Sequence, residues 1–192
     1  MTGSKTDLIM LIKKIGGMPT WVTINKEQSN RIHQQSFEPV DINSFSQMQQ
    51  LAYNIVETHF KDTSSNKEPL CLIINGVAGT GKSYLITAIR SLLQTKCVIT
   101  ATTGKASFNI FGVTIHSLLK LPCGNRRNND LTGQTLIRLQ ESLNDIDNIV
   151  IDEYSMLSQV TFGWVEKRCR QASGFTNKIF GGLSVILCGD PA

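Results

Sequence analysis

Eight consecutive residues, from Gly76 to Ser83, have the composition and spacing of a phosphate-binding loop. They match the pattern G-x-x-x-x-G-K-[ST]. Glycines let backbone N–H groups turn toward phosphate oxygens without a Cβ clash. In this pattern Lys82 neutralises the β- and γ-phosphates, and the Ser83 hydroxyl binds Mg²⁺. The nucleotide-binding residues predicted here are Gly76, Val77, Ala78, Gly79, Thr80, Gly81, Lys82 and Ser83.

Two acidic residues, Asp152 and Glu153, follow the apolar run 149–151. The carboxyl end of a buried strand in an open α/β sheet faces the ligand crevice. Asp152 is therefore predicted to hold Mg²⁺ through water, and Glu153 to polarise the attacking water, so that the predicted catalytic residues are Lys82, Asp152 and Glu153. Acids after a strand also commonly cap a helix, and the phosphate loop gives this pair its meaning. Two carboxylates favour hydrolysis by water over transfer to a small-molecule acceptor.

Alternating strands and helices are needed to bring these groups together. Continuous apolar runs predict four buried strands, over 70–75, 97–101, 149–152 and 184–188. Helical spacing predicts helices over 48–56, 82–94, 114–121, 134–143 and 158–170. In the last helix the side chains predicted to point inward are Val160, Trp164, Val165 and Cys169. Apolar runs separated by helices indicate an α/β fold with a parallel sheet covered by helices on both faces.

The composition is that of an ordinary globular protein. Of 192 residues, 41% are hydrophobic and 18% charged, which excludes a disordered or collagen-like chain. The net charge of +4 is compatible with a polyanionic partner and equally with chance surface charge. The five cysteines include no C-x-x-C pair, so neither zinc nor a disulfide framework is expected, and an intracellular setting fits better. No stretch reaches the ~18 apolar residues of a membrane span, and no membrane partner is expected.

Further motifs extend along the chain in a fixed order. They read FSQMQ at 45–49, TATTGKAS at 100–107, GVTIHSL at 112–118, DEYSML at 152–157 and FGGLSVILCGD at 180–190. Together with the phosphate loop, they make residues 41–192 resemble the Pif-type (petite integration frequency) DNA helicases of superfamily 1B. The resemblance extends in particular to the helicase segment of Helitron-like mobile elements.

The resemblance implies roles for several residues outside the phosphate loop. Gln49 would read the adenine edge, with Gln47 as the alternative if the register differs, and Asp190 would join the nucleotide site. Single-stranded DNA would lie along Thr102, Thr103, Gly104, Lys105 and His116. For His116 a buried, hydrogen-bonded position is the alternative, and for Lys105 a solvated one. The segment with Thr102, Thr103, Gly104 and Lys105 is expected to be a loop at a strand end. Phe108 and Phe111 are expected to pack under this loop rather than to stack on bases.

The resemblance also implies the architecture and the activity. Residues 41–192 would form the first, RecA-like lobe of a P-loop NTPase, incomplete because it is truncated after the fourth core strand, and residues 1–40 a poorly ordered extension with a short helix over 8–15. The strand over 184–188 would lie between 70–75 and 149–152, which leaves 70–74 at the sheet edge unless the N-terminal segment covers it. The activity implied is that of an ATP-dependent 5′-to-3′ DNA helicase that uses ATP and Mg²⁺ in DNA repair, recombination and telomere maintenance. The expected location is the nucleus, with the mitochondrion as the alternative.

Two other functions remain open. A nucleotide kinase would share the phosphate loop, but we find no arginine-rich lid segment, and the Asp152–Glu153 pair favours water activation. The third hypothesis is a non-catalytic nucleotide-binding or DNA-binding remnant. Because the second helicase lobe is expected to be missing, this hypothesis describes the isolated chain well. It predicts weak ATP binding, little hydrolysis and no unwinding.

Overall fold

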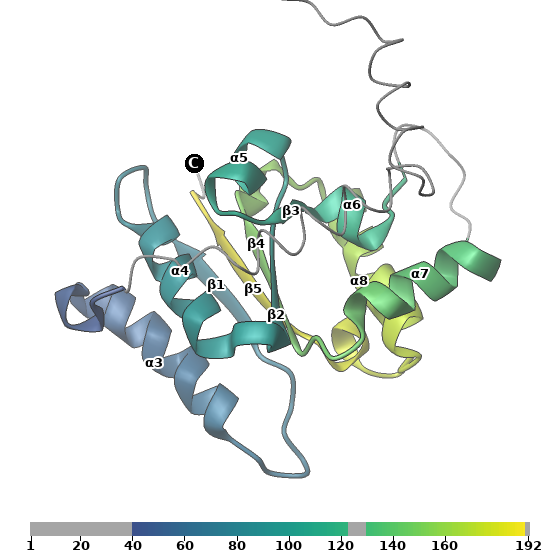
Figure 1. Cartoon of the computed structure of the whole chain (residues 1–192), viewed down its shortest axis with the longest axis horizontal. Coiled ribbons are helices and arrows are strands. Elements are labelled where there is room, and N and C mark those ends of the chain that lie inside the picture. The colour runs from purple at the N-terminus through teal and green to yellow at the C-terminus, as the bar shows by residue number, and fades with distance from the viewer. Residues whose placement is uncertain (1–39, 123–129, 191–192) are drawn as a thin grey trace, which may run out of the picture. The chain divides into compact units, whose positions relative to one another are not determined.

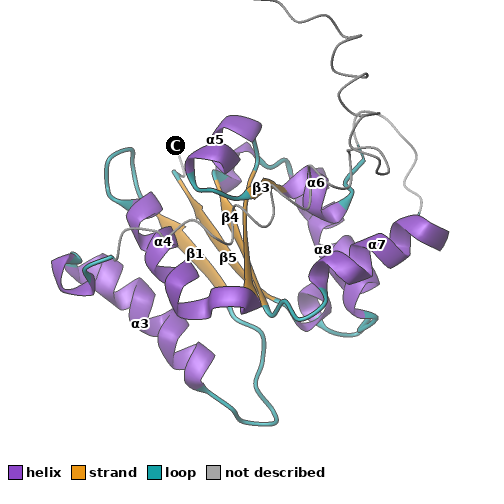
Figure 2. Ribbon diagram, viewed as in Figure 1, coloured by secondary structure: helices purple, strands orange, loops and turns teal. Residues whose placement is uncertain are grey.

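A five-stranded parallel sheet is the centre of the part of the chain that the computed structural model describes, residues 40–122 and 130–190 (Figures 1 and 2). Its strands are β1 (Cys71–Asn75), β2 (Cys97–Ala101), β3 (Val113–Thr114), β4 (Asn148–Asp152) and β5 (Ser184–Gly189). The expectations for the N-terminal extension up to residue 39, including its helix over 8–15, lie outside the described residues.

The order of the strands is β1-β5-β4-β2-β3, and all pairs are parallel. The last strand in the chain therefore lies between the first strand and β4, as expected. The four predicted strands are confirmed. The predicted count was one short, because β3 has only two residues, too few to form an apolar run. It begins directly after Gly112, where a Cβ would lie 2.5 Å from the Ile99 carbonyl oxygen.

Helices cover both faces of the sheet, as predicted (Figure 1). In β4, Val150 packs with the core beneath the helices over 47–61 and 82–93. Ile149 and Ile151 pack with the core beneath the helices over 115–119, 133–143 and 159–173. This alternation follows from the period of two in a strand. The α-helices of the described residues are α3 (Gln47–Lys61), α4 (Lys82–Leu93), α5 (Gly104–Asn109), α6 (Ile115–Leu119), α7 (Gly133–Leu143) and α8 (Gln159–Ser173). None of them is long and apolar enough to cross a membrane.

One predicted inward residue of α8 is wrong. Val165 and Cys169 are buried, as predicted, and Trp164 is half-buried, but Val160 is 73% exposed. Val160 precedes Val165 by five residues, which places it about 140° around the helix from the buried stripe.

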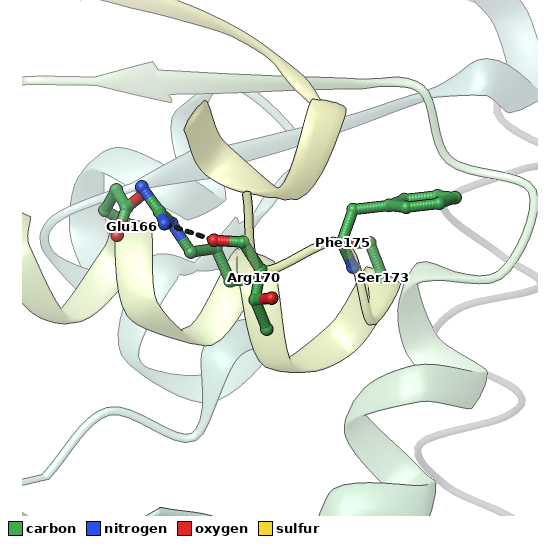
Figure 3. A network of polar contacts seen from close by, with 5 residues as sticks. Glu166, Arg170, Ser173 and Phe175 are labelled. Carbon is green, nitrogen blue, oxygen red and sulfur yellow. Dashed lines mark hydrogen bonds and ion pairs between the residues drawn. The ribbon is translucent and has the colours of Figure 1, made fainter. Parts of the chain in front are cut away.

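The end of α8 is fixed by a polar network that leads the chain back to β5 (Figure 3). Arg170 donates from Nε to the Glu166 carboxylate and from Nη1 to the Thr176 carbonyl. The turn after the helix packs so closely that a Cβ at Gly181 would lie 2.6 Å from the Cys169 carbonyl oxygen. The approach to β5 is therefore held by backbone contact and charge.

The expected sheet edge is confirmed at β1. Among the described strands, β1 pairs only with β5, and its side chains alternate between exposed and half-buried. Ile73 is 57% exposed on this strand. An edge strand with an exposed apolar side chain is a template for association with another chain.

We predict that the 192-residue chain self-associates through β1 and that Ile73→Lys weakens this association about tenfold, because it removes apolar contact and adds charge at the edge. Sedimentation velocity over a concentration series measures the effect. Ile179→Lys is the matched control, because Ile179 is 58% exposed but lies on a 3₁₀ turn, not on a strand. A wild-type chain that stays monomeric and melts cooperatively above about 65 °C would contradict the prediction.

Candidate functional site

The predicted phosphate loop lies between β1 and α4, at the carboxyl edge of the sheet. Gly79 and Gly81 have φ of +83° and +80°, in the left-handed region that glycine adopts without strain. At Gly76 a Cβ would lie 2.6 Å from the Thr80 hydroxyl oxygen. The glycines of the motif are therefore required by the backbone, as the sequence pattern predicts. Ser83 follows on the first turn of α4 and is exposed.

Lys82 folds back over its own loop. Its Nζ donates to the carbonyl oxygens of Gly76 at 2.5 Å and Val77 at 2.9 Å. The Thr80 hydroxyl donates to the same Val77 carbonyl at 2.9 Å. The ammonium group thus donates to carbonyl oxygens of the loop the hydrogen bonds that phosphate oxygens would otherwise accept from it.

Gln49 connects the loop to α3. Its Oε1 accepts from the Ser46 backbone N–H at 2.9 Å, and the Ser46 hydroxyl accepts from the Gln49 N–H at 3.4 Å, which forms a capping box. Its Nε2 donates to the carbonyl oxygens of Thr80 at 3.2 Å and Gly81 at 3.3 Å. Both ends of this amide are therefore engaged within the protein. Gln47 is the first residue of α3 and is exposed.

Asp152 is the last residue of β4, and Glu153 follows it at the same edge of the sheet. β5 separates β4 from β1, so Asp152 lies about 10 Å, or two strand spacings, from the end of β1. Asp152 is buried, and its Oδ1 accepts from the Glu153 N–H at 3.0 Å. Burial raises the pKa of this carboxyl, and the charge of Glu153 also raises it. The Glu153 N–H and the charge of Lys82 lower it.

Glu153 has an unusual backbone conformation. Its φ of +55° is in the left-handed region, which costs a non-glycine residue energy. Its side chain is exposed at the crevice, and its carbonyl accepts from the Thr102 hydroxyl at 3.4 Å. The strained turn therefore directs the carboxylate away from the core and links β4 to the end of β2.

Contacts that join the ends of β1, β5 and β4 were not predicted from the sequence. The Tyr154 hydroxyl donates to Asn75 Oδ1 at 2.7 Å. A Cβ at Gly189 would lie 2.8 Å from the Tyr154 ring, and the Gly76 N–H donates to the Gly189 carbonyl at 3.0 Å. Glycine at the end of the last motif is the signal that could have indicated this close packing. Asp190, the predicted nucleotide contact, follows directly and is half-buried.

The predicted DNA-track residues lie at the carboxyl ends of β2 and β3. Thr102 and Thr103 follow β2, and the Thr103 hydroxyl accepts from the Ala106 N–H at 3.2 Å to cap α5. The prediction that this segment is a loop is wrong, because Gly104 and Lys105 are the first two residues of the short helix α5. Lys105 is exposed, and His116 lies half-buried on α6 after β3.

The expected packing of the two phenylalanines is also wrong. Phe108 is 78% exposed and Phe111 is 41% exposed. The buried residues of this segment are Ala106, Ser107 and Ile110, which occupy the face of α5 and the turn that contact the sheet. The short helix rotates Phe108 away from the core.

A cavity of about 410 Å³ opens beside the phosphate loop. Gln49, Thr80 and Lys82 line its loop end, and apolar side chains of α3 and β1, among them Leu51 and Ile73, line the remainder. Its apolar wall and polar loop end suit a planar ring with one polar edge.

The residues at this edge also suit a magnesium ion that is shared with a ligand. In residues 40–122 and 130–190, no cluster of three or more His, Cys, Asp or Glu residues could hold a metal unaided. Ser83 and Asp152 supply a hydroxyl and a carboxylate, which are hard oxygen donors. Mg²⁺ characteristically takes one or two protein ligands together with substrate phosphates.

Comparison with known proteins gives a consistent result. The family model of the PIF1-like helicases matches residues 44–192. The chain is 39% identical over 127 residues to the ATP-dependent DNA helicase PIF4 of Trypanosoma brucei brucei, and 39% identical over 125 residues to human PIF1, covering 62% of the chain in each case. With the Trypanosoma brucei brucei helicase PIF7 it is 32% identical over 165 residues, 82% of the chain.

Solved structures show the same fold. The Bacteroides Pif1 helicase in complex with ADP-AlF3 and ssDNA is 25% identical, with a TM-score of 0.61 over 76% of this chain and 32% of that one. The Candida albicans Pif1 helicase is also 25% identical, with a TM-score of 0.57 over 77% and 32%. The similarity to Helitron-like elements stays a prediction.

The extent of these matches sets what they establish. The chain spans 16%, 15% and 19% of the lengths of PIF4, PIF7 and human PIF1. The family model covers 149 of the 192 residues, from residue 44 to residue 192, and includes the phosphate loop, the strand-end acids and the last strand. This chain belongs to the PIF1-like helicase family.

Proposed function

We propose that this chain binds ATP with Mg²⁺ and hydrolyses ATP as the first motor lobe of a DNA helicase. The observation that carries the proposal is the placement of Lys82, which follows β1, and Asp152, the last residue of β4, at one carboxyl edge of the sheet with only β5 between their strands. A cation on the phosphate loop and a carboxylate at a nearby strand end are the two groups that a magnesium-bound phosphate needs. The relatives' names, ATP-dependent DNA helicases, support this reaction class.

Each residue at the crevice then has a defined task. Lys82 leaves the carbonyl oxygens of Gly76 and Val77 and donates to the β- and γ-phosphates. Ser83, and Asp152 through water, would hold a magnesium ion, which would supply positive charge to the phosphates. Glu153, exposed at the crevice, orients and deprotonates the attacking water.

Gln49 and Asp190 complete the nucleotide contacts. When the base enters the cavity beside the loop, Gln49 gives up its bonds to the Thr80 and Gly81 carbonyls, and its amide reads the adenine edge. Asp190, at the end of β5, follows the glycine whose carbonyl accepts from the loop. Base recognition would in this way release the loop for phosphate.

The proposed DNA path follows the ends of β2 and β3. Thr102, Thr103 and Gly104 offer hydroxyls and backbone, and Lys105 and His116 offer charge and a ring nitrogen to phosphates. The Bacteroides Pif1 helicase was crystallised with ssDNA, which supports this partner. Unwinding would need the second lobe, because translocation requires two grips on DNA. The roles in repair, recombination and telomere maintenance, and a location in the nucleus or alternatively the mitochondrion, are proposed from the resemblance alone.

A second candidate is a nucleotide-binding remnant with little turnover. One observation favours it for the isolated chain: Lys82 and Gln49 together donate four hydrogen bonds to carbonyl oxygens of the loop itself. A nucleotide must break these bonds before it binds, which lowers its affinity.

Lys82→Ala is expected to weaken Mg·ATP binding by about 10- to 100-fold, because one charged set of hydrogen bonds is lost. Glu153→Gln should keep the binding and lower hydrolysis at least about 100-fold. Titration calorimetry and phosphate release, with and without single-stranded DNA, measure the two effects. Lys96→Ala is the control, because Lys96 pairs with Asp147 at the opposite edge.

Equal ATP affinity in wild type and Lys82→Ala would contradict the proposed site. Phosphorylation of a nucleoside monophosphate by the wild-type chain would point to a kinase. Binding of ATP without DNA-stimulated hydrolysis would select the remnant.

Asp152→Asn is expected to stabilise the ligand-free chain at neutral pH. Burial raises the pKa of Asp152 above its unfolded value of 3.8, so the folded state binds more protons in the window between these two pKa values. The free energy of unfolding therefore falls as the pH rises through that window, and it stays lower above it. The asparagine carries no charge and avoids this loss.

Melting temperatures of both proteins, measured in chelator from acid to neutral pH, test this prediction. The advantage of Asp152→Asn should vanish below the unfolded pKa. A variant less stable than wild type at neutral pH would mean that the bond from the Glu153 N–H outweighs burial.

A further inference from the structure

The side chain of Phe108 has a position that burial in the fold does not explain. At 78% it has the largest exposed fraction of the exposed large apolar residues in the described part of the chain. It lies on α5, three residues after Lys105, which is also exposed. Residues three apart are neighbours on a helix surface, with Cβ atoms about 5–6 Å apart. A ring and a cation therefore stand side by side on the outer face of α5.

The backbone that carries this ring is fixed. The Phe111 N–H donates to the Phe108 carbonyl at 3.1 Å, and Phe111 has a φ of +50°. Arg90 Nη2 donates to the carbonyl oxygens of Ile110 at 2.6 Å and Phe111 at 3.1 Å. The Gly112 N–H donates to the Ser107 carbonyl at 2.8 Å. Two phenylalanines are thus presented by one turn that α4 holds in place through Arg90.

The surroundings of the ring favour a nucleic-acid base over an apolar protein surface. The exposed neighbours of Phe108 on α5 are Gly104, Lys105 and Asn109, which are polar, charged or without a side chain. An apolar docking patch would need a larger continuous apolar area. An aromatic ring beside a cation, by contrast, is the combination with which proteins bind single strands, since every base has a face to stack on and a phosphate to pair.

We propose that Phe108 stacks on a base of single-stranded DNA whose phosphate is paired with Lys105, and that Phe111 offers the next ring. This inference rests on the proposed function, because it places the strand along α5. It adds a base contact to a path that is otherwise made of phosphate contacts. A stack is tolerant of sequence and independent of salt, whereas the Lys105 contact is weakened by salt.

Fluorescence anisotropy with labelled oligothymidylate, and with an abasic strand of equal length, tests the proposal on the full chain over a range of salt. Phe108→Ala should weaken oligothymidylate binding about 5- to 100-fold at every salt concentration, leave abasic binding unchanged, and leave the salt slope unchanged. Phe108→Tyr should restore the affinity, because it keeps the ring. Lys105→Ala should weaken both ligands and reduce the salt slope by about 0.7.

Phe175→Ala is the matched control. Phe175 is 56% exposed and has a lysine beside it, with Lys178 Nζ 5.5 Å from the ring centroid. It lies between α8 and β5, at the amino edge of the sheet (Figure 3). The substitution should leave binding unchanged.

Suppose that the wild-type chain binds DNA and that Phe108→Ala has the same ratio of oligothymidylate affinity to abasic-strand affinity as wild type. This result would overturn the stack but would leave the proposed DNA path intact. If the wild-type chain binds neither strand while it still binds Mg·ATP, the DNA part of the proposed function fails, and the stack fails with it.

Discussion

The parallel register of β5 is the constraint on which the whole site depends. Because β5 pairs with β1 on one side and β4 on the other, Asn75 lies opposite Gly189, and Asp152 lies opposite Cys188. The phosphate loop after β1 and the acids at the end of β4 are thereby brought to one edge of the sheet. The Gly76 N–H and the Tyr154 hydroxyl then connect these strand ends directly. Without β5, β1 would have no partner among the described strands, and the lysine and the carboxylate would not share a crevice.

The ligand-free site holds its reactive groups at an energetic cost. Asp152 is buried with a raised pKa, and Glu153 has a left-handed backbone. In the ligand-free site, Lys82 Nζ and Gln49 Nε2 donate hydrogen bonds to carbonyl oxygens of the loop. Under the proposed function, a magnesium ion would relieve the first cost by pairing the buried carboxylate, and phosphate oxygens would offer Lys82 stronger acceptors. The ligand-free loop is in this sense closed, and the nucleotide is expected to open it.

The sequence was most informative where chemistry and periodicity coincide. The apolar runs located β1, β2, β4 and β5 to within one or two residues, and the motif spacing identified Lys82 and Asp152. It was least informative for short elements, since β3 and α5 are too brief to show a period. The exposure of Val160 follows from its place five residues before Val165, outside the buried stripe. The exposure of Phe108 depends on how the short α5 rotates against the sheet, which neighbouring residues alone do not determine. The bond between Tyr154 and Asn75 joins residues 79 apart, and no local pattern contains it.

A nitrogen–proton correlation spectrum of the labelled chain, recorded during titration with Mg·ADP, tests the account most directly. We predict that the shifted signals are those of the Gly79, Gly81 and Glu153 amides and of the Gln49 side-chain amide. Phosphate oxygens would approach the loop amides, a metal ion would pair the Asp152 carboxylate that accepts from the Glu153 N–H, and the base would replace the carbonyl partners of Gln49 Nε2. A second cavity, of about 380 Å³, lies at the opposite edge of the sheet and is lined in part by Asp147 and Lys178. Shifts confined to that cavity, or no shifts at all, would contradict the account.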